Sequence, residues 1–160
     1  VGIEYNNRID SQINLVTGMR TNETLGGRRT DLAVGIQTFE NNGSNNSSYN
    51  IINLGASSSF LFPLKQMIQL SVGGRVDYKY ISNKDNYNNN KGIDRDPSTI
   101  GLITGLVFSP SYHPDYEIYV QISAISSEKS GYDANTDKSD PVASSITFFN
   151  KGAIGIKYYL

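Results

Sequence analysis

The stretch from Gln66 to Ser82 alternates strictly between apolar and polar or small side chains. One series is Ile68, Leu70, Val72, Gly74, Val76, Tyr78 and Tyr80, and the other is Gln69, Ser71, Gly73, Arg75, Asp77 and Lys79. A β-strand sends successive side chains to opposite faces, so the pattern predicts a strand with one apolar and one polar face. Because the pattern recurs along the chain, we expect an all-β protein that closes into a barrel with its apolar side toward lipid.

The composition excludes several other classes of protein. A length of 160 residues predicts one domain, residues 1–160. The net charge of -1 leaves no basic excess for a nucleic-acid partner, and the absence of cysteine excludes disulfides and thiolate metal sites. No apolar run is long enough for a membrane-spanning helix. We expect any signal peptide to have been removed before Val1.

Alternation predicts eight strands joined by two kinds of connection. The strands are residues 1–8, 12–20, 29–40, 49–62, 66–82, 99–108, 116–127 and 144–160. Short turns are predicted at Thr21–Arg28, Pro63–Lys65 and Ser109–Asp115, and longer polar loops at Asn41–Ser48, Asn83–Ser98 and Glu128–Ala143. An even strand number brings both termini to one rim, and turns at one rim with loops at the other are typical of outer-membrane barrels.

The predicted lipid face holds most of the large apolar residues. Besides the apolar series within residues 66–82, its members include Val1, Ile3, Tyr5, Ile13, Leu15, Met19, Leu32, Val34, Ile36, Ile52, Leu54, Phe60, Phe62, Ile100, Leu102, Leu106, Phe108, Ile118, Val120, Ile122, Ile146, Phe148, Ile154 and Ile156. Three residues break the pattern, since Ile103, Val107 and Ile125 fall on the predicted polar face. The aromatic residues Tyr5, Tyr49, Phe62, Tyr78, Tyr80, Phe108, Tyr116 and Tyr158 are candidates for interfacial girdles.

The polar face is rich in small residues, and this decides which face points inward. A soluble lipocalin-type barrel also alternates but turns its apolar face inward. Glycines such as Gly55, Gly101 and Gly105 weaken a strand and would serve no purpose on a solvated surface. The narrow interior of an eight-stranded barrel suits small residues beside a few long ones. A barrel with its polar face inward is therefore favoured, and a soluble small-ligand-binding barrel is the alternative.

Charged residues on the polar face are then expected to lie in the lumen. The predicted lumen polar network is Glu4, Asp31, Arg75, Asp77, Lys79, Lys151 and Lys157. Isolated buried charges are costly, so we expect these groups to form pairs. A structural network that fills the barrel is favoured over a narrow conducting pore, because eight strands leave little lumen.

The end of the chain carries a possible assembly signal. Gly152, Ile154, Ile156, Tyr158 and Leu160 share one face of the last predicted strand. This resembles the terminal strand of bacterial outer-membrane proteins, which the barrel-assembly machinery reads, although Phe is the commoner last residue in that family. With the strand number and loop asymmetry, the chain resembles the small eight-stranded outer-membrane barrels related to OmpX and the transmembrane domain of OmpA.

That resemblance implies a multi-pass barrel in the outer membrane of a Gram-negative cell. Such barrels contact outer-membrane lipids and lipopolysaccharide, and they act in envelope structure, adhesion or host interaction, or within a larger assembly through their loops or wall. The resemblance is architectural, and a fold alone does not assign a function.

The sequence offers little catalytic or metal chemistry. His113 is the only histidine, which excludes a multi-histidine metal site, and it falls in a predicted turn. The loop Lys84–Asp96 and the carboxylates of Asp133, Asp137 and Asp140 lack calcium-loop spacing. We therefore predict a non-enzymatic protein with no catalytic, cofactor-binding or metal-binding residues, and leave a lipid-modifying enzyme as a less favoured alternative.

Overall fold

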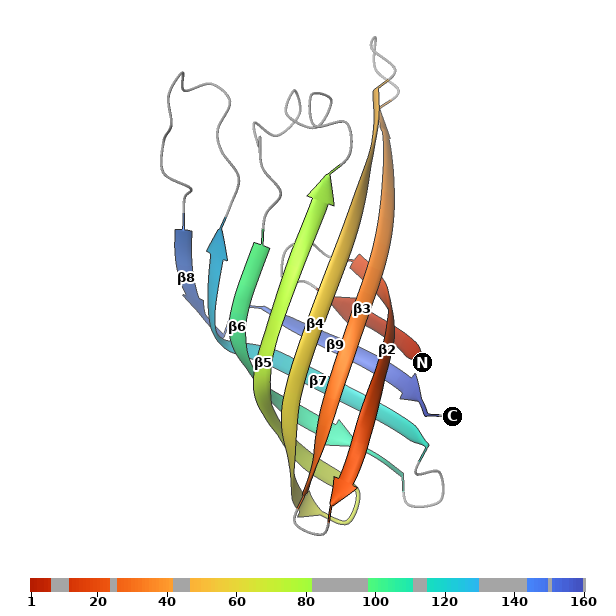
Figure 1. Ribbon diagram of the computed structural model, residues 1–160, viewed down its shortest axis with the longest axis vertical. Coiled ribbons are helices and arrows are strands. Elements are labelled where there is room, and N and C mark those ends of the chain that lie inside the picture. The colour runs from red at the N-terminus through yellow and green to blue at the C-terminus, as the bar shows by residue number, and fades with distance from the viewer. Residues whose placement is uncertain are drawn as a thin grey trace.

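The computed structural model describes residues 1–6, 12–23, 26–41, 47–81, 98–110, 115–129, 144–149 and 151–159. Within these residues the chain forms only strands, which Figure 1 shows in sequence colours. They are β1 (Gly2–Asn6), β2 (Gln12–Glu23), β3 (Gly26–Asn41), β4 (Ser47–Lys65), β5 (Ile68–Ile81), β6 (Ser98–Phe108), β7 (Tyr116–Lys129), β8 (Ser144–Phe148) and β9 (Gly152–Tyr158). In the described part of the chain, no helix is long and apolar enough to cross a membrane.

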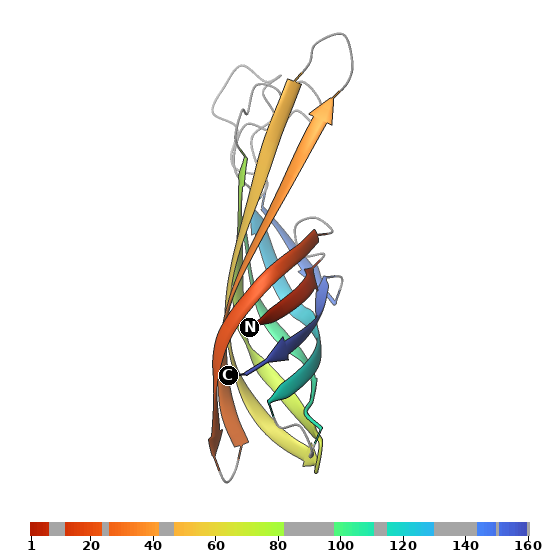
Figure 2. The ribbon, with the colours of Figure 1, turned by 90° about the vertical axis from the view of Figure 1, so that its right-hand side faces the viewer.

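The strands close into an eight-stranded antiparallel up-and-down barrel with β8 as an additional strand. Successive strands from β1 to β7 pair with one another, β7 pairs with β9, and β9 pairs with β1 to complete the ring. Val1 lies beside the end of β9, and its amino group donates a hydrogen bond to the Tyr158 carbonyl at 2.5 Å. Figure 2 shows β3 and β4 extending as a long hairpin beyond the other strands. The predicted fold class is thus confirmed as an all-β closed barrel.

The last strand was predicted as one element, residues 144–160, and this is wrong. The chain breaks into β8 and β9, which pair with successive parts of β7. Phe149 lies in the break with a φ of 50°, a left-handed conformation that a bulky residue rarely adopts. The Phe149 amide donates to the Ser123 carbonyl, and the Ser123 amide donates to the Lys151 carbonyl, so the irregular segment stays anchored to β7.

A second irregularity lies opposite, in β7, and it corrects the prediction for Ile125. Leu102 pairs with Ile125 whereas Ile103 pairs with Ser123, so β7 contains an extra residue between these pairs. Such a bulge reverses the facing of the residues beyond it. Ile125 therefore lies on the outer face with 44% exposure, while Ile103 and Val107 are buried inside as their positions predicted.

The predicted turns are shorter than expected. β2 and β3 continue through most of the predicted Thr21–Arg28 turn and approach each other at Glu23 and Gly26. Pro63–Lys65 belongs to β4, with an irregular register there, and the turn is at Gln66 and Met67. We call the end with these two hairpin connections the turn rim and the opposite end the loop rim. The structure does not describe residues 42–46, 82–97 and 130–143, which make up most of the predicted loops, or most of the Ser109–Asp115 turn. The ends of the predicted loops, such as Asn41, Ser98 and Glu128, belong to strands.

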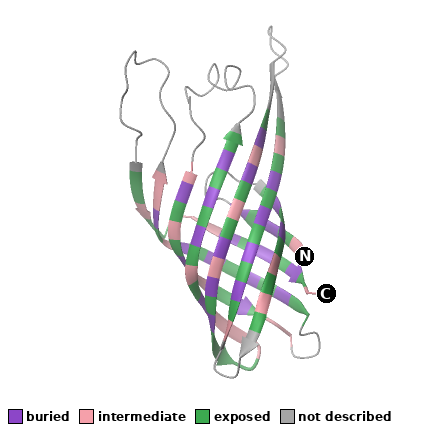
Figure 3. Ribbon diagram, viewed as in Figure 1, coloured by how far each residue is buried: buried purple, intermediate pink, exposed green. Residues whose placement is uncertain are grey.

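Burial alternates along the strands, with apolar residues outside and polar residues inside (Figure 3). Large apolar side chains are exposed around the whole ring, including Ile3 at 56%, Leu15 at 68% and Ile154 at 49%. Within the described residues the buried hydrophobic cluster is small, with Leu61, Val107 and Tyr119 as its members. Of the candidate girdle residues, all are exposed except Tyr49, whose side chain lies outside the described part.

Candidate functional site in the barrel interior

The interior contains most of the predicted lumen polar network. Glu4, Asp31, Arg75, Asp77, Lys79 and Lys157 are all at most 6% exposed. They come from β1, β3, β5 and β9, at inward positions of the alternating pattern. Two groups of ion pairs form among them and their neighbours, and one tyrosine connects the groups.

The first group is centred on Arg75. Its guanidinium donates two hydrogen bonds to the Glu4 carboxylate, at 2.8 and 2.7 Å. Its Nε donates to both carboxylate oxygens of Asp77, at 2.8 and 3.0 Å. The Asn6 amide also donates to Asp77, at 3.3 Å. Arg75 is therefore neutralised on two sides, which is the arrangement that offsets the cost of burying a charge.

The second group is centred on Arg29, nearer the turn rim. Arg29 Nε donates to Asp31 Oδ2 at 2.6 Å, and its Nη1 lies 3.0 Å from Glu117 Oε1. Lys157 forms an ion pair with the other oxygen of Asp31. Arg20 also lies 3.3 Å from Glu117 Oε2. Arg20, Arg29 and Lys157 thus share two carboxylates, those of Asp31 and Glu117.

Tyr119 connects the two groups. Its hydroxyl donates to Glu4 Oε2 at 2.8 Å, and the Arg29 guanidinium lies 3.8 Å from its ring centroid. Lys157 Nζ lies 4.7 Å from the same centroid, so the ring contacts two cations. Gly155 makes room for the ring, because a Cβ there would lie 2.4 Å from Tyr119 atoms. This close approach explains why a glycine occurs on an inward face.

At the turn rim the interior ends in hydrogen bonds that Arg20 donates to neutral side chains, in addition to its ion pair with Glu117. Arg20 donates to Ser109 Oγ at 2.8 Å and to Gln69 Oε1 at 2.5 Å. Tyr159, which follows the end of β9, donates its hydroxyl to Glu117 Oε2 at 3.1 Å. Burial and the nearby Glu117 carboxylate raise the pKa of the Tyr159 phenol above its ordinary value, which favours the protonated form that donates this hydrogen bond.

Lys151 does not join either group. It forms an ion pair with Glu128, and the two side chains are 13% and 21% exposed. Lys79 is buried at 2% exposure and lies on the same strand face as Arg75 and Asp77, toward the loop rim. The structure thus brings Glu4, Arg75 and Asp77 together, and Asp31 with Lys157, and separates Lys151 from both sets.

Arg20, Arg29, Glu117 and Tyr119 were missing from the predicted network, although their positions in the alternation carried the signal. Glu117 and Tyr119 alternate with outward Ile118 and Val120 in the predicted strand 116–127. Arg29 gives a weaker signal, because it is the first residue after the predicted Thr21–Arg28 turn.

The residues of the predicted assembly signal are only partly described. Ile154, Ile156 and Tyr158 point outward with exposures between 41% and 49%, and Gly152 begins β9. Leu160 lies outside the described residues, as do His113, the loop Lys84–Asp96 and the carboxylates of Asp133, Asp137 and Asp140.

The interior chemistry is that of a filled core. Arg29, Tyr119 and Lys157 are among the largest fully buried side chains, and they occupy the lumen between opposite walls. The interior carboxylates of Glu4, Asp31, Asp77 and Glu117 all form ion pairs with arginine or lysine side chains. Within the described ranges, no three His, Asp or Glu side chains are arranged to hold a metal ion.

Comparison of the chain with models of protein families, with curated proteins and with solved structures finds no match.

Proposed function

We propose that this chain is a non-enzymatic integral barrel of the bacterial outer membrane, with a lumen filled by its own polar side chains. The observation that carries the proposal is the combination of two opposite surfaces on one closed sheet. Large apolar side chains are exposed around the ring, while buried arginines, lysines and carboxylates pair inside it. Water would be a poor solvent for such a wall, whereas lipid favours it.

The height of the apolar wall fits a bilayer. On β5 the outward series runs from Ile68 to Tyr80. At about 3.3 Å per residue and a strand tilt near 40°, this run spans roughly 30 Å along the barrel axis, the thickness of a hydrocarbon core. Tyr78 and Tyr80 at one end, and Phe108 and Tyr116 at the other, supply the aromatic residues typical of membrane interfaces.

A soluble small-ligand-binding barrel is the weaker alternative. That function needs an apolar cavity inside the sheet. Here Arg75, Arg29 and Tyr119 occupy the interior, and most of the large apolar side chains lie outside. The same filling disfavours a conducting pore.

The role that we propose is in envelope structure, in adhesion, or as a membrane-embedded component of a larger assembly. A rigid barrel with longer polar connections at one rim is suited to present those connections to a partner. Contacts with outer-membrane lipids and lipopolysaccharide, and with the barrel-assembly machinery during insertion, are part of this proposal.

Heat-modifiable gel migration of purified outer membranes tests location and closure together. We expect the unheated protein to be in the outer-membrane fraction and to migrate faster than the boiled protein. A folded, monodisperse protein in detergent-free buffer would contradict the proposal.

A loop exchange tests where a protein partner binds. Replacing residues 83–97 with a short Gly-Ser linker is expected to preserve the gel shift and abolish partner binding, while the same replacement of residues 42–46 serves as the control. Full binding after the first exchange would move the interface to the wall.

A further inference from the structure

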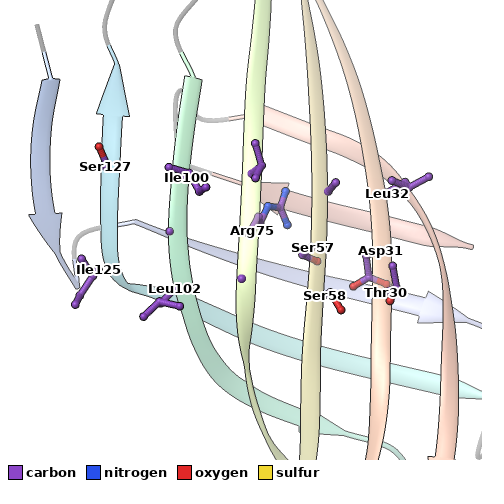
Figure 4. A pocket seen from close by; sticks show the side chains of 14 residues that line it. Thr30, Asp31, Leu32, Ser57, Ser58, Arg75, Ile100, Leu102, Ile125 and Ser127 are labelled. Carbon is purple, nitrogen blue, oxygen red and sulfur yellow. The ribbon is translucent and has the colours of Figure 1, made fainter.

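The outer wall of the barrel is hollowed by an apolar groove across β3 to β7. The groove has a volume of about 610 Å³, and Figure 4 shows Thr30 and Ser58 toward one end of it and Leu102 and Ile125 toward the other. It follows one row of cross-strand partners, in which Thr30, Ser58, Gly74, Leu102 and Ile125 are successive neighbours. Five strands at about 4.8 Å spacing make this row roughly 19 Å long.

Small residues create the groove. Gly74 lies in this row, and Ala56 lies in the next outward row toward the loop rim, together with Leu32 and Ile100. A Cβ added at Gly74 would have only the Gly101 carbonyl oxygen as a neighbour, at 3.9 Å. Packing within the barrel therefore does not require a glycine at this position, in contrast to Gly155.

A cation lies beside the groove, toward the turn rim. Arg28 is exposed on the outer face, in the row next to Thr30, and its Nε donates to Ser58 Oγ at 3.1 Å. Its backbone amide donates to Thr21 Oγ1 at 3.2 Å. Among the residues that the structure describes, no carboxylate forms an ion pair with Arg28.

We propose that this groove binds one phospholipid, with an acyl chain along the row over Gly74 and the phosphate at Arg28. The inference rests on the proposed membrane location. A charged arginine on a lipid-facing wall is costly unless an anion neutralises it, and a phosphodiester accepts hydrogen bonds from a guanidinium in the fork geometry. The Ser58 hydroxyl accepts the bond from Arg28 and can donate its own proton to the same group, and Thr30 also lines the groove.

A second copy of the chain fits the site less well. A symmetric contact through this groove would bring a second Arg28 to the same patch, with no anion to neutralise either one. The apolar row and the single cation at its end instead match the two parts of a phospholipid.

Native mass spectrometry of the folded protein in detergent tests the site, with phosphatidylglycerol and phosphatidylcholine of identical acyl chains as probes. We expect one phosphatidylglycerol to be retained. Arg28→Gln should weaken its binding by about tenfold, the loss expected for a charge-assisted hydrogen bond. Gly74→Leu, which fills the groove, should weaken the binding of both lipids.

Matched controls are Lys65→Gln, which removes a cation elsewhere at the turn rim, and Val72→Leu, which enlarges an outward residue of β5 outside the groove. Both should retain the lipid as the unsubstituted protein does. Each variant is first checked for the heat-modifiable gel shift.

Equal phosphatidylglycerol binding by Arg28→Gln, Gly74→Leu and the unsubstituted protein would overturn the proposed lipid site. Dimers that Gly74→Leu abolishes would also overturn it and assign the groove to a second copy. A protein that fails to insert into vesicles at all would refute the membrane location itself, which is a separate result.

Discussion

Replacing Glu4 with glutamine tests whether the interior ion pairs hold the barrel together. Glu4 accepts two hydrogen bonds from Arg75 and one from Tyr119, and it is 1% exposed. Glutamine keeps the shape and one acceptor oxygen but removes the negative charge. Arg75 then has only Asp77 to neutralise it.

Removing one member of a buried ion pair costs about 3 to 5 kcal/mol. Because Asp77 still contacts Arg75, we expect the lower end, about 3 kcal/mol in the free energy of unfolding. With an m value of about 2 kcal/mol per molar urea, the unfolding midpoint should fall by roughly 1.5 M.

The assay is urea unfolding of the protein in phospholipid vesicles, followed by loss of the fast-migrating folded band. Glu128→Gln is the control, since it makes the same change in the partly exposed pair with Lys151 and should cost at most about 1 kcal/mol. Equal midpoints for the two variants would refute the reasoning, because they would mean that the Glu4 carboxylate contributes no more than a solvated one.

Two further substitutions probe the two faces of the sheet. Gly155→Val should prevent stable closure, because its Cβ would overlap the Tyr119 ring at 2.4 Å, and we expect the folded gel band to disappear; a normal band would show that the ring can move away. Val120→Arg, at an outward position with 48% exposure, should lower the free energy of unfolding in vesicles by about 2 to 4 kcal/mol. Unchanged stability of Val120→Arg in vesicles would argue that this wall does not contact hydrocarbon.

Alternation was sufficient to predict the strands and their facing where it is unbroken. β5 has the predicted outward series, and the inward Arg75, Asp77 and Lys79 follow from the same two-residue period. Such positions depend only on strand geometry, which the sequence reports locally.

The irregular positions could not be read from the period. The extra residue in β7 turns Ile125 outward, and the break at Phe149 divides the last strand into β8 and β9. Both depend on how two strands register against each other, which is a tertiary property. The sequence also could not predict which charged side chains form ion pairs inside the barrel. Glu4 and Arg75 come into contact only when β1 and β5 take their places in the closed ring.

The most direct test of the proposed membrane location is a measurement of whether water or hydrocarbon surrounds the outer wall. Nitroxide spin labels at Val72 and Val120, in protein inserted into vesicles, should collide readily with oxygen and scarcely with a water-soluble nickel reagent, while a label at inward Ser71 should be shielded from both. Ready access of the nickel reagent to both outward labels would mean that water, rather than hydrocarbon, surrounds the barrel, and would contradict the proposed membrane location.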